Sequence, residues 1–337
     1  MYQKQILRIM AGFILLGSIG CREIKTTTTV QEEGPIVRSI AIKGEARDLH
    51  ESGFPLPVDS SWTIARQLDT QDSSKTITTF TKSFPGISAL QACYQASFIT
   101  PFRVKVEIEV KKKFRWFYTY WEYRETYRAY NPFKLIPITN YLSDEELGQW
   151  IAAPDSDQNR DDQTDRWLMD NLFEEFYQTL LRVTGQIHHP ELTKELLESR
   201  KSDLRVALMD SSDSDDIDEI LAICHATLGT DALRSARTPI DSVFKVIEAK
   251  LEFETDVSSN SYANTIDLPG HIWASNGQIT GHGQAAWQIT SRQFEFDDFS
   301  MWAQSRKPNR ILTIASGILV LILAAGLIIT RIRHRAQ

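Results

Sequence analysis

Apolar and polar residues alternate along several short segments in the first part of the chain. Val104, Val106, Ile108 and Val110 are separated by charged residues, which is typical of a strand with one buried face. Similar alternation bounded by turn-forming residues predicts more strands, two of which form a hairpin. The predicted strands are 36–42, 62–68, 76–83 and 104–110, and a short helix is predicted over 88–98.

An aromatic segment follows over residues 114–127, with aromatic side chains on both faces of an extended chain. One interpretation is a central strand buried on both sides. The other is an aromatic surface that rests on lipid headgroups or holds a ligand, since Trp and Tyr favour such interfaces. The pattern does not decide between these two interpretations.

Apolar positions change to helical spacing after residue 142. Ser143 and Glu146 fit a capping box, and Pro190 and Pro239 suit first helical positions. The spacing predicts helices over 143–152, 165–184, 190–209, 216–228 and 239–253. Strand patterns return after residue 254, with a hairpin over 264–296 in which Asn276-Gly277 and Gly281 or Gly283 would supply positive φ.

These elements predict an α+β fold in which an antiparallel β-rich domain draws strands from both sides of a helical insertion. The two ends of the chain add hydrophobic segments. Lys4 and Arg8 precede an apolar run over 9–20, which is typical of a signal peptide and too short to cross a bilayer. Residues 311–330 carry no charge and extend about 30 Å as a helix, enough to span one.

The predicted organisation therefore has seven parts. They are a signal peptide (1–20), a lipid-linked tether (21–35), a β-rich half (36–142), a helical block (143–253), a C-terminal β hairpin region (254–309), a transmembrane helix (310–330) and a cytoplasmic tail (331–337). Basic residues flank the apolar helix on both sides, so its orientation follows from the signal peptide rather than from charge. This places the ectodomain on the extracytoplasmic, periplasmic side of the cell membrane.

The residues before Cys21, Ser18-Ile19-Gly20, resemble the lipobox of bacterial lipoproteins. The resemblance implies that Cys21 is acylated and becomes the mature N-terminus. Ser18 departs from the Leu that is usual at its position, and the alternative is an ordinary cleavable signal peptide whose cysteine only lies near the cleavage site.

Charge and cysteine content narrow the partners. The chain has a formal net charge of −7, and its acidic residues all lie between the two hydrophobic ends, which argues against nucleic acid as a partner. Apart from Cys21, the cysteines are Cys93 and Cys224. They could form a disulfide in an oxidising compartment, or each could remain a free buried thiol.

Candidate chemistry is sparse, and no cofactor or catalytic residue is predicted. Asp155, Asp157, Asn159 and Asp161 have the alternation of calcium-loop ligands, but Arg160 stands where that loop needs Gly, and a solvated acidic loop is the alternative. His188 and His189 are adjacent, and His271 and His282 could meet across the last hairpin, yet neither pair forms a metal-binding motif. The chain contains no nucleophile elbow or phosphate loop.

In the last hairpin, Leu268-Pro269-Gly270, Ser275-Asn276-Gly277 and Trp287 resemble the arrangement in LppM-type lipoproteins, which have a lipobox before an exported β-rich domain and a membrane helix after it. The long helical block departs from that pattern. The resemblance implies a membrane-tethered β-rich domain without evident catalysis.

The functional hypothesis is a non-enzymatic binding or envelope-assembly module. It would be held at the membrane lipid by Cys21 and residues 311–330, and would contact an envelope protein, lipid or glycan. The alternative is an envelope hydrolase or transferase with a cleft between the helical block and the sheet.

Overall fold

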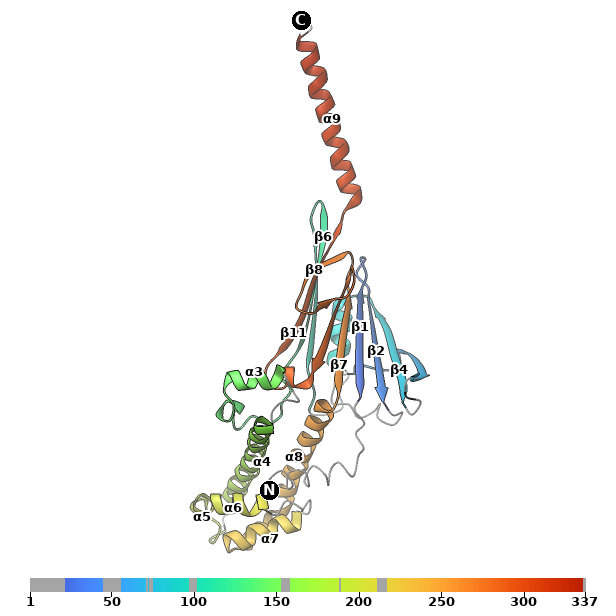
Figure 1. Cartoon of the computed structure of the whole chain (residues 1–337). Helices are drawn as coiled ribbons and strands as arrows, with labels where there is room; N and C mark the ends of the chain where they lie inside the picture. The colour runs from blue at the N-terminus through green and yellow to red at the C-terminus, as the bar shows by residue number, and fades with distance from the viewer. Residues whose placement is uncertain are drawn as a thin grey trace.

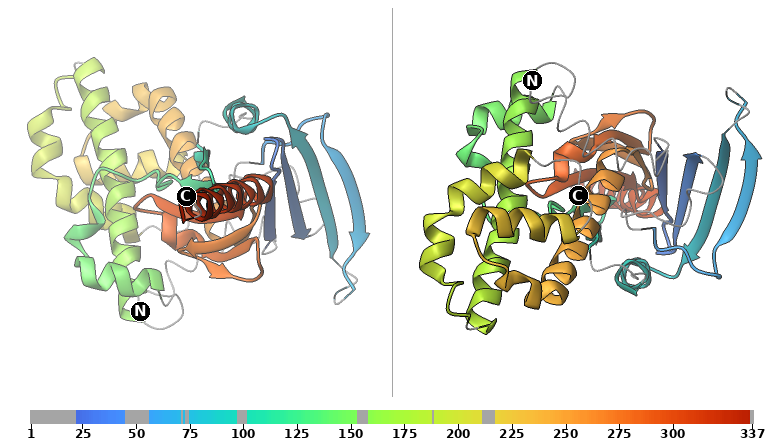
Figure 2. Two further views of the ribbon diagram at one scale, coloured as in Figure 1. Left: turned by 90° about the horizontal axis from the view of Figure 1, so that it is seen from above. Right: turned by 90° about the horizontal axis from the view of Figure 1, so that it is seen from below.

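The computed structural model describes residues 22–44, 56–70, 72, 75–96, 102–152, 158–187, 189–210 and 217–335 of the 337-residue chain. Within these ranges the molecule is elongated (Figure 1). A long helix rises from one end of the β strands, and a group of helices occupies the other end. Figure 2 shows that this group also lies to one side of the strands, away from the larger sheet.

The β part consists of two sheets. The larger has the strand order β3-β4-β2-β1-β7-β10-β9 and the smaller has the order β5-β6-β11-β8, and every pair is antiparallel except β1 with β7. The strands are β1 (Glu23–Val30), β2 (Ile36–Gly44), β3 (Thr63–Leu68), β4 (Thr76–Phe84), β5 (Val106–Phe114), β6 (Tyr118–Tyr127), β7 (Ser261–Asp267), β8 (His271–Ser275), β9 (Gln278–Ile279), β10 (Gln284–Thr290) and β11 (Phe299–Pro308). Each sheet combines strands from before and after the helical insertion, which confirms the predicted α+β fold.

Strand β1 contradicts the predicted tether. Residues 21–35 were predicted to be an extended link to lipid, but Glu23–Val30 forms a strand between β2 and β7 in the larger sheet. Its inward side chains include Thr26 and Thr28, which are buried. Thr has high β propensity, and a Thr-rich segment with polar inward positions lacks the apolar alternation that marks other strands. The prediction was therefore wrong for these residues.

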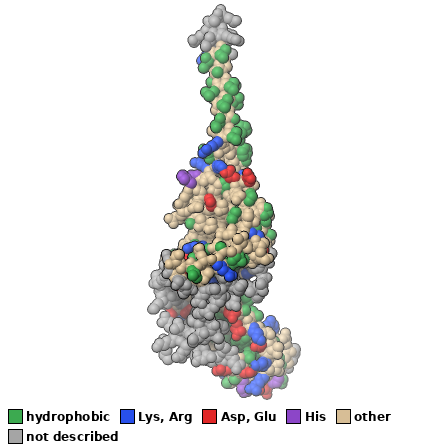
Figure 3. Space-filling view, turned by 90° about the vertical axis from the view of Figure 1, so that its right-hand side faces the viewer, with side chains coloured by type: hydrophobic (Ala, Val, Ile, Leu, Met, Phe, Trp, Pro, Cys, Tyr) green, Lys and Arg blue, Asp and Glu red, His purple; other side chains and the backbone are tan. Residues whose placement is uncertain are grey.

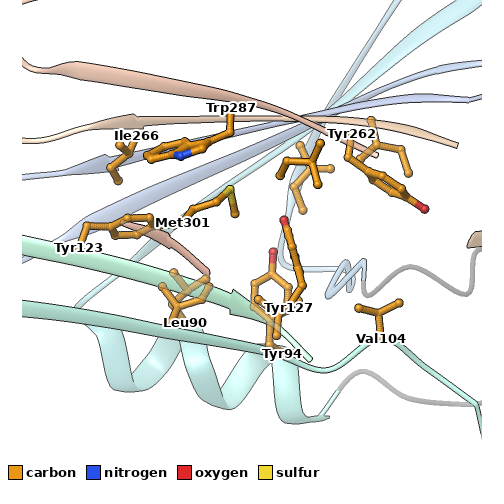
Figure 4. Close-up of a cluster of buried hydrophobic side chains, with 14 of the residues drawn as sticks. Leu90, Tyr94, Val104, Tyr123, Tyr127, Tyr262, Ile266, Trp287 and Met301 are labelled. Atoms are coloured by element: carbon orange, nitrogen blue, oxygen red, sulfur yellow. The ribbon is translucent and has the colours of Figure 1, made fainter. Parts of the chain in front are cut away.

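The space between the sheets holds a single cluster of buried side chains. Figure 4 shows side chains from both sheets and from helix α2 (Ile87–Ala96) that point toward one another, among them Tyr262, Ile266, Trp287, Tyr123, Tyr127, Met301, Leu90 and Tyr94. The Gln91 side chain of α2 bonds the backbone of β5 at Val106 O (3.2 Å) and Ile108 N (2.8 Å). This covers the edge of the smaller sheet, whose backbone groups would otherwise be unpaired.

An ion pair lies inside this apolar cluster. Arg38 of β2 donates to both carboxylate oxygens of Glu125 in β6, at 2.9 and 2.7 Å, and both side chains are almost fully buried. The same guanidinium donates to the Tyr94 hydroxyl at 2.8 Å and to Thr28. A buried charge is costly unless it is paired, so the two strands must pack with Arg38 opposite Glu125. The pair therefore fixes how β2, β6 and α2 are positioned relative to one another.

The helical block has its own core. Its helices are α3 (Asp144–Ala152), α4 (Gln158–Ile187), α5 (Lys194–Ser199), α6 (Lys201–Asp210), α7 (Ile217–Leu228) and α8 (Arg237–Ser258). The capping box is confirmed: Ser143 N donates to the Glu146 carboxylate (2.8 Å) and Glu146 N donates to Ser143 Oγ (3.3 Å). The helix predicted over 190–209 is instead two helices that meet at Arg200, and the first begins after its N-cap Thr193 rather than at Pro190.

The last hairpin was predicted with the wrong role for its glycines. Among the described glycines, only Gly34, Gly229 and Gly270 have positive φ. Gly277 is required for space instead, because an added Cβ would lie 2.4 Å from the ring of Trp287. An added Cβ on Gly283 would lie 2.6 Å from the Leu268 carbonyl oxygen. A glycine in a turn sequence can be required for positive φ or for close approach of neighbouring atoms, and the sequence alone does not distinguish these two requirements.

Candidate membrane-contact site

Helix α9 (Arg310–Arg335) projects away from the body of the molecule (Figure 1). Its segment Arg310–Ile329 has a mean hydropathy of 2.7, and 0% of it is buried. Figure 3 shows apolar side chains along the helix, with Lys, Arg and His side chains at its base. The core helix of a soluble protein would be buried, so α9 is not one. Its length and composition are sufficient to cross a membrane, which suggests membrane association.

Asn309 connects β11 to α9 and is held by the turn between β5 and β6. Its side-chain amide donates to the carbonyl oxygens of Arg115 (2.6 Å) and Trp116 (3.2 Å), and its Oδ1 accepts from the Thr119 hydroxyl (2.9 Å). The Trp116 indole N–H donates to the Ser316 hydroxyl on α9 at 2.8 Å. The first turns of α9 are thus hydrogen-bonded to the hairpin, which sets the direction of the helix relative to the sheets.

The turn of this hairpin, together with the end of β11 and the start of α9, presents a group of aromatic and basic side chains that we call the foot. Its aromatic members are Phe114, Trp116, Phe117 and Tyr118, which are 63%, 57%, 50% and 37% exposed. Its basic members are Lys113, Arg115, Arg306, Lys307 and Arg310. Aromatic rings beside Lys and Arg at the end of an apolar helix match the composition that favours the membrane–water interface.

The two interpretations of the aromatic segment apply to different residues. Trp121, Tyr123 and Tyr127 point into the space between the sheets and are buried, as a central strand requires. Tyr118 and Tyr120 alternate with them and face outward. The segment is therefore buried on one face, and only its turn is an exposed aromatic surface.

A hollow of about 250 Å³ opens on the outer face of the smaller sheet, close to the foot. It is lined by Lys111, Lys113, Arg115, Tyr120, Trp121, Glu122, Trp273, Gln304 and Ser305. Three of these side chains are cationic and one is anionic, although the chain as a whole carries a net charge of −7. A lining of this charge could bind an anionic group of a ligand, and the aromatic side chains of the foot lie beside it.

His271 and His282 lie at the same end and meet as the sequence suggested. Their ring centroids are 5.6 Å apart, and Ile272 N donates to the His282 carbonyl at 2.7 Å. Across the described ranges, no group of three or more His, Cys, Asp and Glu side chains is placed to hold a metal ion. The pair is a ring contact between the start of β8 and the turn that precedes β10.

A second, larger hollow of about 790 Å³ lies at the junction with the helical block. It is lined by Phe102, Arg103, Lys105, Glu107, Arg128, Ala129, Tyr130, Asn131, Pro132, Lys134 and Phe253. The one carboxylate in this lining, Glu107, accepts from Arg128 at 3.0 Å. The lining therefore presents cations and aromatic rings, and not the paired carboxylates that glycoside hydrolysis uses.

Two carboxyl groups lie near this junction hollow, of which Glu295 is buried and Glu254 is half-buried. Burial raises the pKa of Glu254 to about 7. Burial, together with the charge of Glu254, raises the pKa of Glu295 to about 8, and a hydrogen bond from the Asn131 amide (3.0 Å) opposes the shift only in part. A raised carboxyl pKa can mark an acid catalyst, but neither group lines the hollow, so the geometry assigns them no catalytic contact.

Of the remaining predicted site residues, the structure describes only some. Cys21 lies outside the described residues. Cys93 and Cys224 are both free thiols that belong to different hydrophobic clusters, so the possible disulfide between them is not formed. Of the calcium-loop candidates, Asp155 and Asp157 lie outside the described residues, whereas Asn159 and Asp161 belong to helix α4. The calcium loop therefore stays a prediction.

The motif residues of the last hairpin do come together. Asn276 Oδ1 accepts from the Trp287 indole N–H (3.0 Å) and from the backbone N–H of Trp302 (2.8 Å). The Ser275 hydroxyl donates to the Trp302 carbonyl (3.0 Å) and accepts from Gly277 N (2.9 Å). These contacts connect the β8–β9 turn to β10 and β11, so the motif has a structural role in this chain.

Sequence reasoning missed two features of the candidate site. At the far end of the β strands it did not single out Arg22, which is almost fully buried and pairs with Asp256 and Asn260 at the end of α8. It also missed the hollow near the foot, whose residues come from β5, β6, β8 and β11. The alternation of Lys111 and Lys113 on one strand face was the available signal for the hollow.

Comparison with known proteins adds little to this description. No family model matches the chain, and no curated protein matches it. The NMR structure of the folded domain of LppM (Rv2171) from Mycobacterium tuberculosis is similar at 7% sequence identity and a TM-score of 0.29, over 86% of this chain and 91% of that one. This weak likeness agrees with the resemblance in the last hairpin and carries no argument about activity or ligand.

Proposed function

We propose that the protein is a membrane-anchored extracytoplasmic lipoprotein that acts as a non-enzymatic binding or envelope-assembly module. In this proposal α9 spans the cell membrane, the foot rests on the lipid surface, and the β domain holds the helical block away from the bilayer. The observation that carries it is the placement of α9 and the helical block at opposite ends of the β strands (Figure 1).

The chemistry of the foot supports this orientation. Aromatic rings such as Trp116 gain from the amphipathic interface, and Lys and Arg side chains are attracted to anionic headgroups there. The hydrogen bonds of Asn309 hold the foot beside the first turn of α9. A body seated in this way presents the helical block to partners within the envelope, and confinement to a surface raises its effective concentration for neighbours there.

The orientation is tested with a fluorophore attached to full-length protein in vesicles that contain nitroxide lipids. The two labelling positions are Trp116→Cys at the foot and Lys194→Cys on exposed α5. We expect quenching by the bilayer at position 116 and none at position 194. Equal quenching at the two positions would mean that the body lies flat on the membrane, and it would contradict the proposal.

The binding role is tested by photo-cross-linking in native membranes. A photo-reactive residue replaces Lys194 on the helical block in one variant and Glu109 on the exposed face of β5 in the control. We expect a discrete cross-linked envelope component from position 194 and not from position 109. The same products from both positions would indicate random collision and would argue against a docking role for the block.

The alternative is an envelope hydrolase or transferase, and the junction hollow is the feature that favours it. Its cationic side chains, Arg103, Lys105 and Lys134, would suit an anionic substrate. Turnover of anionic envelope polymers by the purified ectodomain, lost on Lys105→Ala, would support this alternative over the binding module.

A further inference from the structure

The junction hollow has walls from both parts of the molecule. Its lining comes from the chain that enters β5 (102–107), the chain that leaves β6 (128–134) and Phe253 of α8. Phe253 packs in the cluster between the sheets, and Phe133, inside the second segment, packs in a cluster with α3 and α4. Packing therefore holds these walls in place, and a molecule in the hollow would contact the β domain and the helical block together.

Three aromatic rings form the floor of the hollow. The ring centroids of Phe102 and Tyr130 lie 6.1 and 5.8 Å from that of Phe253. Tyr130 and Phe253 are buried and Phe102 is half-buried, whereas the lysines of the lining are exposed. A flat or apolar group that enters the hollow can therefore bury its surface against these rings.

Cations line the hollow around this floor, and two of them have no partner of their own. Arg128 donates to Glu107 at 3.0 Å and pairs with Asp298. Lys105 and Lys134 are exposed, and neither forms an ion pair or a side-chain hydrogen bond with any residue that the structure describes. Like charges repel one another, so an anion that pairs with both ammonium groups stabilises this arrangement.

The nearby carboxyl groups do not cancel this positive charge in mildly acidic solution. Asn131, which lines the hollow, donates to Glu295 at 3.0 Å, and Glu254 follows Phe253 in the chain. Burial raises the pKa of Glu254 to about 7, and burial together with the charge of Glu254 raises the pKa of Glu295 to about 8. Both groups are therefore mainly protonated, and uncharged, at about pH 6.5.

We propose that the junction hollow binds a small organic anion that carries at least two negatively charged groups on a ring. The ring packs on the floor, and the charged groups pair with Lys105 and Lys134. The volume of about 790 Å³ lies within the range of about 300–1,000 Å³ that is usual for small-molecule sites. The inference goes beyond the proposed function and does not depend on it, because none of these residues belongs to the foot or to α9.

Isothermal titration calorimetry on the full-length protein in detergent at about pH 6.5 tests the ligand class. The probe is benzene-1,3,5-tricarboxylate. Propane-1,2,3-tricarboxylate keeps its carboxylates without the ring, and benzene-1,3,5-trimethanol keeps the ring without the charges. We expect the probe to bind about tenfold more tightly than either comparison compound, since contacts with the floor and with the lysines each contribute. Equal affinity for the compound without a ring, or for the one without charge, would overturn the proposal, and so would no binding of the probe.

Lysine variants test the place of binding. Lys105→Gln and Lys134→Gln should each weaken binding of the probe by about threefold to fivefold, as expected for an ion pair that is partly exposed to water. The matched control is Lys245→Gln on α8, which removes the same charge from a side chain that is 70% exposed and outside the hollow, and should leave the affinity unchanged. Equal weakening in all three variants would show a response to overall charge and would overturn the proposal.

Hydrogen exchange locates the bound probe without any substitution. We expect slower exchange in segments 102–107 and 128–134 when the probe is present. Protection confined to other segments, such as those around the hollow near the foot, would overturn the inference. Either result leaves the quenching test of the proposed function unaffected, and failure of that test would leave the affinity of the junction hollow unchanged.

Discussion

The interior between the sheets and the junction with the helical block each contain a fully buried carboxyl group, but their pKa values shift in opposite directions. Burial acts to raise the pKa of Glu125, yet the charge and hydrogen bonds of Arg38 outweigh it and the pKa is lowered. Burial raises the pKa of Glu295 to about 8, and the nearby charge of Glu254 adds to the shift. The difference is that the Arg38 guanidinium donates two hydrogen bonds to Glu125, whereas the charge of Arg292 lowers the pKa of Glu295 only in small part.

This comparison identifies where pH acts on the molecule. The lowered pKa of Glu125 stabilises the fold above its unfolded value of 4.5, and this contribution is lost as the pH falls through the folded value. The raised pKa of Glu295 acts in the opposite sense, because the folded state keeps a proton that the unfolded chain releases. The interior should therefore weaken in acid, and the junction should weaken as the pH rises from 4.5 to about 8.

The largest effect should come from breaking the interior pair. Arg38→Ala should lower the free energy of unfolding by about 3–5 kcal/mol, because it leaves a carboxylate buried without its partner. Urea unfolding at neutral pH measures this. The matched control is Arg38→Met with Glu125→Leu, which removes both charges and should recover most of the loss. A loss that persists in the double variant would show that packing, and not charge, dominates at this site.

The junction should give the next largest effect, and it should depend on pH. The free energy of unfolding should fall by on the order of 3 kcal/mol between about pH 5 and about pH 8, because over this range the unfolded chain releases a proton that Glu295 keeps in the folded state. Glu295→Gln keeps a neutral group that can still bond Asn131, so its unfolding curves should vary less over this range. If the free energy of unfolding of the variant fell equally with pH, the group that titrates would not be Glu295.

Arg22→Ala extends the comparison of the two regions, because Arg22 is a cation at the junction that is paired with a carboxylate, Asp256. We expect a loss of about 2 kcal/mol, because Asp256 and Asn260 lose a charged donor. Hydrogen exchange should quicken at the start of β1 and the end of α8. Lys25→Ala on the same strand is the control, since Lys25 is 60% exposed and should change neither quantity.

The smallest effect on stability should come from the foot. Trp116 is 57% exposed, so Trp116→Ala should change the free energy of unfolding in detergent by no more than about 0.5 kcal/mol. Trp121, on the adjoining strand, is 3% exposed, and its replacement by Ala should lose about 3 kcal/mol. Equal losses in the two variants would mean that the foot is part of the folded core.

Most regular elements could be predicted because their patterns are local. The alternation in β5 and the helical spacing in α4 and α8 each report one buried face. Strand β1 could not be found in this way, since Thr28 is buried by a contact with Arg38 and Arg38 is in turn neutralised by Glu125, far along the chain. Buried polar residues that bond one another have the same local sequence pattern as residues exposed to solvent, so the sequence predicts a solvated segment for both.

The candidate site was predictable to a similar degree. An exposed aromatic surface was one of two interpretations of the 114–127 segment, and the location of its exposed part at the base of α9 depends on the Asn309 contacts. The hollow beside it needs residues from four strands.

The amino-acid order alone settles that the chain has an apolar C-terminal segment able to cross a bilayer, since transfer of uncharged side chains into hydrocarbon depends on local composition. It likewise settles the helical character of the insertion. The assembled fold decides the direction of β1 and the opposite pKa shifts of Glu125 and Glu295. These properties depend on desolvation and on contacts between residues far apart in the chain, which no local pattern encodes.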